Sequence, residues 1–173
     1  MQYSVYNNTI TQMLRMLSHA QNWLEKAISY AEEQNIDQNT LAAYRLRPDM
    51  LPLTKQIQIA CDVSKGCAGR LSGQDAPSHE DNEATLSQLI ERIEKTQAFL
   101  KEITPEQFEG AETKDLEIKL PKMTLSFVGS DYVNQFVLPN LYFHLSTAYA
   151  ILRYAGVPLG KMDFLGQIGQ PAQ

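Results

Sequence analysis

The sequence has few of the residues that carry the commonest protein chemistry, because its 173 residues include only two cysteines and three histidines. Cys61 and Cys67 lie six residues apart in a stretch of helical periodicity, which would separate their Cα atoms by about 9 Å along a helix axis. A disulfide needs Cα atoms within about 7 Å of each other. We therefore expect two packed free thiols rather than a redox or metal-binding pair.

Several other signals are missing. The chain contains no HExxH, HxxxH or CxxC pattern, no glycine-rich phosphate loop and no GxSxG elbow, so the commoner enzyme motifs give no assignment. No apolar run approaches the roughly 18 residues of a membrane span. The first residues have neither the basic start nor the apolar stretch of a signal peptide. We expect a cytoplasmic protein that does not bind membranes.

Positive charge is also scarce. The 15 lysines and arginines are scattered among 20 acidic residues, which gives a net charge of −5. A protein that binds duplex nucleic acid would concentrate basic side chains on one face, so we expect no nucleic-acid partner. Hydrophobic residues make up 43% of the chain and charged residues 20%, which is typical of a globular protein. The length suits one domain over residues 1–173.

Apolar residues recur every three or four positions in four segments, which predicts four amphipathic helices. We expect these helices over residues 4–33, 49–73, 78–104 and 130–154. Between residues 114 and 129 the apolar period changes to two, which predicts a two-stranded hairpin. A lone hairpin is marginally stable, so it should lie against the helices. The chain is predicted to be mainly α, an up-and-down four-helix bundle with a short β-hairpin between helices 3 and 4.

Polar residues and prolines indicate where these elements begin and end. Asp49 is expected to cap the second helix, with Pro52 in its first turn. Residues 78–81 are expected to form a capping box at the start of the third. Pro139 lies inside the fourth helix and should kink it or divide it in two. The tail over residues 157–166 is too apolar for a free end and should fold back onto the bundle.

Three polar residues share one face of the fourth predicted helix: Asn140, His144 and Thr147. Apolar neighbours indicate that this face lies toward the core, where an imidazole needs a partner for at least one ring nitrogen. His144 is then either a core histidine hydrogen-bonded by Asn140, Thr147 or a tyrosine hydroxyl, or a metal ligand or general base. The sequence alone favours the core histidine.

The remaining candidates are Asp62 and the other two histidines. Turned inward from the second helix, Asp62 would have to pair with a cation or coordinate a ligand, and an outward orientation is favoured. His19 is expected to stack at the bundle surface or form a dimer contact. His79 is expected to be solvated in a charge cluster with Glu80 and Asp81.

Two blocks of sequence resemble a small bacterial family of unknown function within the DinB/YfiT-like superfamily of metalloenzymes. The first block is LPNLYFHLSTAYAILR at residues 138–153, continued by GVPLGKMDFLG at residues 156–166. The second is LRPDMLPL at residues 46–53, continued by QIQIACD at residues 56–62. Together with the order of the helices, the resemblance covers essentially the whole chain.

The resemblance implies a four-helix bundle with a pocket at one end, frequently seen as a homodimer. Metal-binding members use three histidines, one on the second helix and an HxxxH pair on the last, and some act as thiol-dependent transferases or metal-dependent hydrolases. His144 matches the second histidine of that pair, and Asn140 stands in place of the first. On the second helix Gln56, Gln58 and Asp62 are the polar candidates. Because Asn is a poor ligand for zinc or nickel, we expect the metal triad to be largely lost.

Three functions remain open. The first is a small-ligand pocket near His144, formed with Asn140, Thr147 and Asp62. The second is a metal-dependent hydrolase or thiol transferase in which His144, with Asp62 or water, holds zinc or nickel. The third is a non-catalytic homodimeric interaction protein. The sequence favours the first and identifies neither the ligand nor a reaction.

Overall fold

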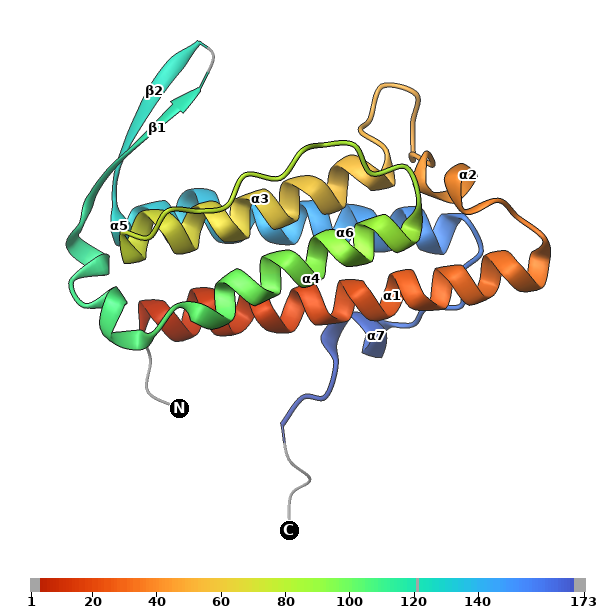
Figure 1. Ribbon diagram of the computed structural model, residues 1–173, viewed down its shortest axis with the longest axis horizontal. Helices are drawn as coiled ribbons and strands as arrows, with labels where there is room; N and C mark the ends of the chain where they lie inside the picture. The colour runs from red at the N-terminus through yellow and green to blue at the C-terminus, as the bar shows by residue number, and fades with distance from the viewer. Residues whose placement is uncertain (1–3, 121, 170–173) are drawn as a thin grey trace.

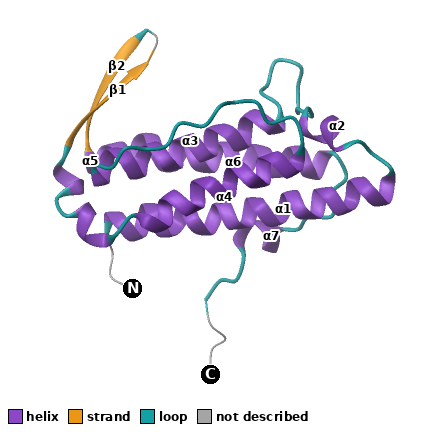
Figure 2. Ribbon diagram, viewed as in Figure 1, coloured by secondary structure: helices purple, strands orange, loops and turns teal. Residues whose placement is uncertain are grey.

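The computed structural model describes residues 4–120 and 122–169. Four long helices lie side by side (Figures 1 and 2): α1 (Gln12–Gln34), α3 (Leu53–Ser72), α4 (Leu86–Glu102) and α6 (Leu138–Tyr154). Helix α3 packs on α6 and α4, and α1 packs on the same two helices from the opposite corner. The predicted four-helix bundle is confirmed. Among the described residues, no helix is both long and apolar enough to cross a membrane.

The connections of the bundle differ from strict up-and-down alternation. Helices α3 and α4 run in the same direction, because residues 73–85 cross back over the length of the bundle before α4 begins (Figure 1). Such a crossover is a known variant of four-helix bundles. The reason is local: the predicted capping box at residues 78–81 does not start a helix, so the third helix begins later and at the other end.

Two helix starts therefore differ from the predictions. Helix α4 is capped by Thr85, whose Oγ1 accepts from the Gln88 backbone N–H at 3.2 Å while Gln88 Oε1 accepts from the Thr85 N–H at 3.1 Å. Helix α3 follows Pro52, and Asp49 is not its cap. The polar linker before it contains a short helix, α2 (Gln38–Ala42), which the sequence did not reveal. Its five residues are too few for periodicity to identify.

Pro139 does not divide the fourth helix. The chain passes from α5 (Gly129–Asp131) through a π-helical segment, η4 (Tyr132–Val137), into α6. A proline lacks an N–H and its ring clashes with the carbonyl one turn earlier, and a π turn accommodates both. The helix therefore continues with a wider turn just before Pro139. A second π segment, η1 (Asn7–Thr11), leads into α1.

The hairpin forms as predicted, from β1 (Asp115–Leu120) and β2 (Met123–Val128). Its apolar residues pair across the strands on one face, with Ile118 opposite Leu125 and Leu116 opposite Phe127. The Phe127 ring packs against Tyr132 and Phe136 of η4, at centroid distances of 6.0 and 6.1 Å. The outer end of the hairpin projects beyond the helices (Figure 1), so the expected packing against the bundle holds at its base.

Two 3-10 turns, η2 (Pro105–Phe108) and η3 (Ala111–Thr113), connect α4 to the hairpin. The C-terminal tail folds back as predicted and forms α7 (Lys161–Leu165) against α1. Trp23 Nε1 donates to the Asp163 carbonyl at 2.8 Å, and the rings of Trp23 and Phe164 stack at 5.3 Å. His19 Nδ1 donates to the Phe164 carbonyl at 2.9 Å, so this histidine holds the tail.

Both cysteines are free and fully buried, as predicted. Burial raises the pKa of the Cys61 thiol to about 12, and it raises the pKa of the Cys67 thiol as well. A thiol with such a pKa is a poor nucleophile at neutral pH. The two side chains therefore act as small core residues.

We expect Gly156→Ala to destabilise the bundle by about 1–2 kcal/mol. Gly156 follows α6 with a φ of 98°, and a Cβ there would collide with the Tyr30 hydroxyl. Gly73 is the matched control, since its φ is 79° but a Cβ would meet no atom within 4 Å. Urea unfolding should show a larger loss for Gly156→Ala than for Gly73→Ala. Equal losses would mean that Tyr30 moves aside at no cost.

Candidate functional site

The predicted site residue His144 faces α3 and meets a glutamine. Its Nδ1 lies 2.7 Å from Gln56 Oε1, and Gln56 Nε2 donates to the Leu51 carbonyl at 3.0 Å. The second bond fixes the orientation of the amide, so Oε1 can only accept, and Nδ1 of His144 must carry the proton. The other ring nitrogen, Nε2, is left with a lone pair.

The imidazole is nearly enclosed. His144 is 8% exposed and Gln56 is 2% exposed. The rings of Phe143 and His144 pack edge to face, with their centroids 5.1 Å apart. Burial lowers the pKa of His144 because the charged form loses its hydration. The ring is therefore neutral at pH 7, with one nitrogen donating and the other available as an acceptor.

Asn140 and Thr147 lie on the same side of α6 as His144 and bond to their own helix. Asn140 Nδ2 donates to the Phe136 carbonyl at 2.9 Å, and Thr147 Oγ1 donates to the Phe143 carbonyl at 2.8 Å. The structure thus groups Asn140, His144 and Thr147 at one edge of α6, where Gln56 is the partner of the imidazole. Of the three polar candidates on the second predicted helix, Gln56 is the one that reaches His144.

Asp62 lies away from this group. Its Oδ1 accepts from Arg92 Nη2 at 2.8 Å and from Lys65 Nζ at 2.9 Å, so it faces α4 rather than α6. Six residues separate it from Gln56, which turns it by roughly 240° around the helix. The side chain is 42% exposed, which fits the outward orientation favoured by the sequence. The structure therefore does not bring Asp62 to His144.

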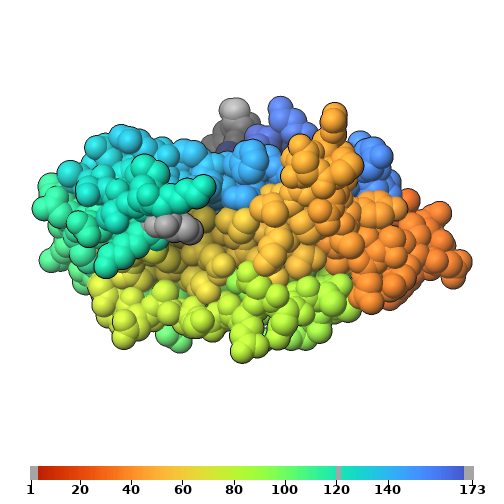
Figure 3. Space-filling model, turned by 90° about the horizontal axis from the view of Figure 1, so that it is seen from above, coloured from red at the N-terminus to blue at the C-terminus, as the bar shows by residue number. Residues whose placement is uncertain are grey.

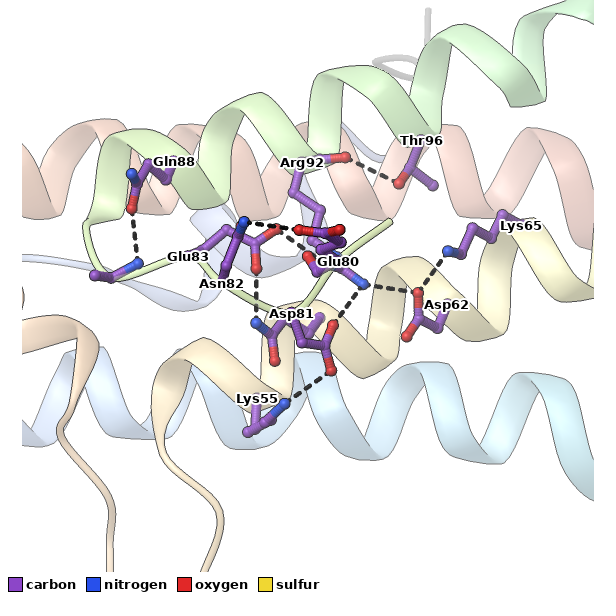
Figure 4. A network of polar contacts seen from close by, with 12 residues as sticks. Lys55, Asp62, Lys65, Glu80, Asp81, Asn82, Glu83, Gln88, Arg92 and Thr96 are labelled. Atoms are coloured by element: carbon purple, nitrogen blue, oxygen red, sulfur yellow. Dashed lines mark hydrogen bonds and ion pairs between the residues drawn. The ribbon is translucent and has the colours of Figure 1, made fainter. Parts of the chain in front are cut away.

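A network of polar contacts around Arg92 was not predicted (Figure 4). Arg92 of α4 is 2% exposed, and its guanidinium contacts Asp62 at 2.8 Å, Asp81 at 3.0 Å and Glu83 at 2.9 Å. It also donates to the Glu80 carbonyl at 3.0 Å. Because Asp81 and Glu83 belong to the crossover, Arg92 ties that segment to α3 and α4. The three acidic residues among positions 80–83 were the available signal in the sequence.

This network shifts the titration of its own carboxylates. A hydrogen bond from Lys55 and the charge of Arg92 lower the pKa of Asp81, although partial burial opposes them. Burial also disfavours the charged form of Glu83, but hydrogen bonds from Arg92 and Gln58 outweigh it and lower the pKa of that carboxyl. Both carboxylates are therefore ionised at neutral pH and form ion pairs with the Arg92 guanidinium.

His79 is not the solvated residue that the sequence suggested. It is half-buried beside the arginine network, and burial together with Lys65 and Arg92 lowers its pKa. It lines a cavity of about 320 Å³ between the crossover and the first turns of α4, with Ser78, Glu91 and Lys95 among the other lining residues. His79 belongs to the crossover, which Arg92 holds against α4 through Asp81, Glu83 and the Glu80 carbonyl.

We expect stability to fall as the pH decreases from 7.5 to 5.5. The pKa values of His79 and His144 are lowered in the folded state. In the unfolded chain histidine has its ordinary pKa near 6.5, so below that pH the unfolded chain binds more protons than the folded one. Stability is present above that pH and is lost as the pH falls toward the folded-state pKa values. Urea unfolding at both pH values should show a smaller loss for His144→Gln than for the wild type; an equal loss would contradict a depressed pKa at His144.

Among the described residues, no group of three or more His, Cys, Asp or Glu side chains lies close enough to hold a metal ion. The partner that α3 offers to His144 is an amide rather than an imidazole. The donors around His144 are thus suited to hydrogen bonding, and they do not match the three-histidine set that the resemblance implies.

Comparison with known proteins supports the resemblance. The profile of a family described as a domain of unknown function, DUF1993, matches residues 5–165. A crystal structure of a DinB family member protein from Shewanella denitrificans is similar, with a TM-score of 0.89 and 37% sequence identity over 98% of this chain and 96% of that chain. No curated protein matches the sequence. The chain therefore belongs to the DUF1993 family and has a DinB-like fold.

Proposed function

We propose that this protein binds a small polar ligand through hydrogen bonds at His144, without the metal ion of the wider superfamily. In this proposal Nε2 of His144 accepts a proton or hydrogen bond from the ligand, and Gln56 holds the ring. Asn140 and Thr147 lie beside the ring and supply its polar surroundings. Asp62 serves the Arg92 network instead.

The contact between His144 Nδ1 and Gln56 Oε1 carries the proposal. At 2.7 Å it fixes both the tautomer and the orientation of the imidazole, as the outer partners of functional histidines commonly do. A core histidine could be held in the same way by any acceptor. Three further observations favour a ligand-binding role over a core role. The His144 ring is neutral, its Nε2 has a free lone pair, and the residue corresponds to a ligand position of the superfamily.

The chemistry of the donor set argues against the metal-dependent alternative. Zinc and nickel sites in proteins use imidazole, thiolate or carboxylate ligands. Here Gln56 and Asn140 offer amides, and the carboxylate of Asp62 is bound to Arg92 and Lys65. A hydrolase or transferase that relied on a bound metal would have to hold it with His144 and water alone.

A thermal-shift screen with small carboxylic acids and thiols tests the proposal. A ligand at about 100 times its Kd stabilises a protein by about 2.7 kcal/mol, which should raise the Tm by roughly 5–10 °C for a chain of this size. The shift should disappear in His144→Gln and persist in Ser146→Ala, an exposed control on the same helix.

Two results would contradict the proposal. A ligand-induced shift that survives in His144→Gln would mean that the ligand binds elsewhere. Stoichiometric zinc or nickel in protein purified without a tag or chelator, lost in His144→Gln, would support the metal-dependent enzyme.

A further inference from the structure

The cavity between the crossover (residues 73–85) and α4 is lined by polar and charged side chains alone. Its volume is about 320 Å³, at the lower end of the range of small-molecule sites. Figure 3 shows the crossover, in yellow to yellow-green, at the outer surface of the molecule, so the cavity behind it is close to solvent. Most ligand sites are largely apolar. A cavity with this lining therefore suits a small molecule that is polar throughout.

The crossover runs antiparallel to α4 along this cavity. Near the start of α4, the Ala84 backbone N–H donates to Gln88 Oε1 at 2.7 Å. One turn further along the helix, Arg92 donates to the Glu80 carbonyl at 3.0 Å, and Figure 4 shows the two residues side by side. Earlier residues of the crossover thus lie beside later residues of α4, and the cavity has two distinct ends.

The end of the cavity toward the later residues of α4 is cationic. His79 and Lys95 line it. Burial lowers the pKa of the His79 imidazole, and the charges of Lys65, Arg92 and Lys95 lower it further, against the opposing charge of Asp62. Lys95 is exposed and, within the described residues, forms no hydrogen bond or ion pair. This end therefore suits an anionic group such as a carboxylate.

Negative charge is available one turn earlier on α4. Glu91 precedes Lys95 by four residues, a spacing that allows an ion pair along the helix, yet in the part of the chain that the structure describes Glu91 has no cationic partner. Glu80 adds a second carboxylate, whose partner is the Asn82 side chain at 3.4 Å. Two carboxylates without a cation therefore border the cavity and suit an ammonium group.

Three buried polar atoms around this cavity have no hydrogen-bond partner: Gln58 Oε1, His79 Nδ1 and Arg92 Nε. Across residues 4–120 and 122–169, they are the buried side-chain nitrogen and oxygen atoms that lack one. Folded proteins pair nearly all of their buried polar groups, because an unpaired group is costly. Their concentration beside one polar cavity favours a binding role for this region over a purely structural one.

We propose that this cavity binds a free α-amino acid. Its carboxylate would lie at the cationic end, between His79 and Lys95, and its ammonium group would lie at Glu91. The crossover forms one wall of the site, and Arg92 holds that wall in place. No residue of α6 lines the cavity, so this site is separate from His144 and does not depend on the function proposed above.

Calorimetric titration of the full chain with individual α-amino acids tests the proposal. At least one amino acid should bind with a Kd below about 10 mM. Its methyl ester lacks the carboxylate charge and its N-acetyl derivative lacks the ammonium charge, so each should bind at least about 10-fold more weakly. Failure of every amino acid to bind, or equal binding by either derivative, would overturn the proposal.

Charge-removing variants locate the bound amino acid. Lys95→Gln and Glu91→Gln should each raise its Kd by at least about 10-fold, and both positions are exposed, so both variants should fold. Lys101→Gln and Glu102→Gln are matched controls, exposed on the same helix and outside the cavity, and should bind as the wild type does. His144→Gln should also bind normally, which separates this site from the proposed function. Unchanged binding in either Lys95→Gln or Glu91→Gln would overturn the proposal.

Discussion

Replacing Arg92 with Met should destabilise the protein by about 3 kcal/mol, because removal of one partner from a buried ion network leaves the others uncompensated. The variant keeps most of the side-chain volume, so the loss reports on charge. Glu83 should account for most of the loss, since its side chain is 9% exposed and its charge would stay buried without a partner. Asp62 and Asp81 are 42% and 44% exposed and can be hydrated instead. For a chain of this length the Tm should fall by roughly 6–12 °C.

The matched control is Arg15→Met, at an exposed position of α1, which should change stability by less than about 0.5 kcal/mol. Hydrogen exchange should locate the loss of stability: the hydrogen-bonded amides of Ala84 and Thr85, at the end of the crossover, should exchange faster in Arg92→Met and remain unchanged in the control. A loss below about 1 kcal/mol, with these amides exchanging as slowly as in the wild type, would mean that Lys55 and Gln58, which bind Asp81 and Glu83, hold the crossover without the arginine.

The double variant Gln56→His and Asn140→His should bind zinc or nickel with at least about 100-fold higher affinity than the wild type. Gln56 contacts His144 across the α3–α6 interface and Asn140 lies one turn before it, so three imidazoles would converge on one point. Three histidines with one open position form a common zinc site. At 100 times its Kd the metal should stabilise the variant by about 2.7 kcal/mol.

Isothermal titration calorimetry and thermal shifts with zinc and nickel check this prediction. A variant with both new histidines and His144→Gln is the control, because it keeps two imidazoles and loses the third. Tight binding by the double variant alone would mean that the wild type preserves the positions of the superfamily triad with amides in two of them. Equal metal affinity in the wild type and the double variant would contradict that interpretation.

Much of the fold could be read from periodicity, because four helices and one hairpin each keep a regular apolar pattern over many residues. The predictions failed at the ends of the helices. Residues 78–81 resemble a helix start, yet the Glu80 carbonyl and the Asp81 side chain bind Arg92. The helix begins instead where Thr85 and Gln88 cap each other. Local chemistry could not reveal that a distant arginine competes for these groups.

The site was only partly predictable for a similar reason. Asn140, His144 and Thr147 share a face because of their spacing on one helix, and spacing is visible in a sequence. The partner on α3 is not visible in the sequence, since Gln56, Gln58 and Asp62 all lie on that helix and differ in their height along it and their direction around it. The register of α3 against α6 turns Gln56 to His144, while Gln58 bonds to Glu83 and Asp62 to Arg92.

Nitrogen-15 NMR of the histidine rings at pH 7 tests the account most directly. The account predicts that His144 is neutral, with a protonated Nδ1 that donates to Gln56 and an unprotonated Nε2. Gln56→Leu should release this tautomer preference. A His144 ring that is doubly protonated at pH 7, or that carries its single proton on Nε2, would contradict the central claim.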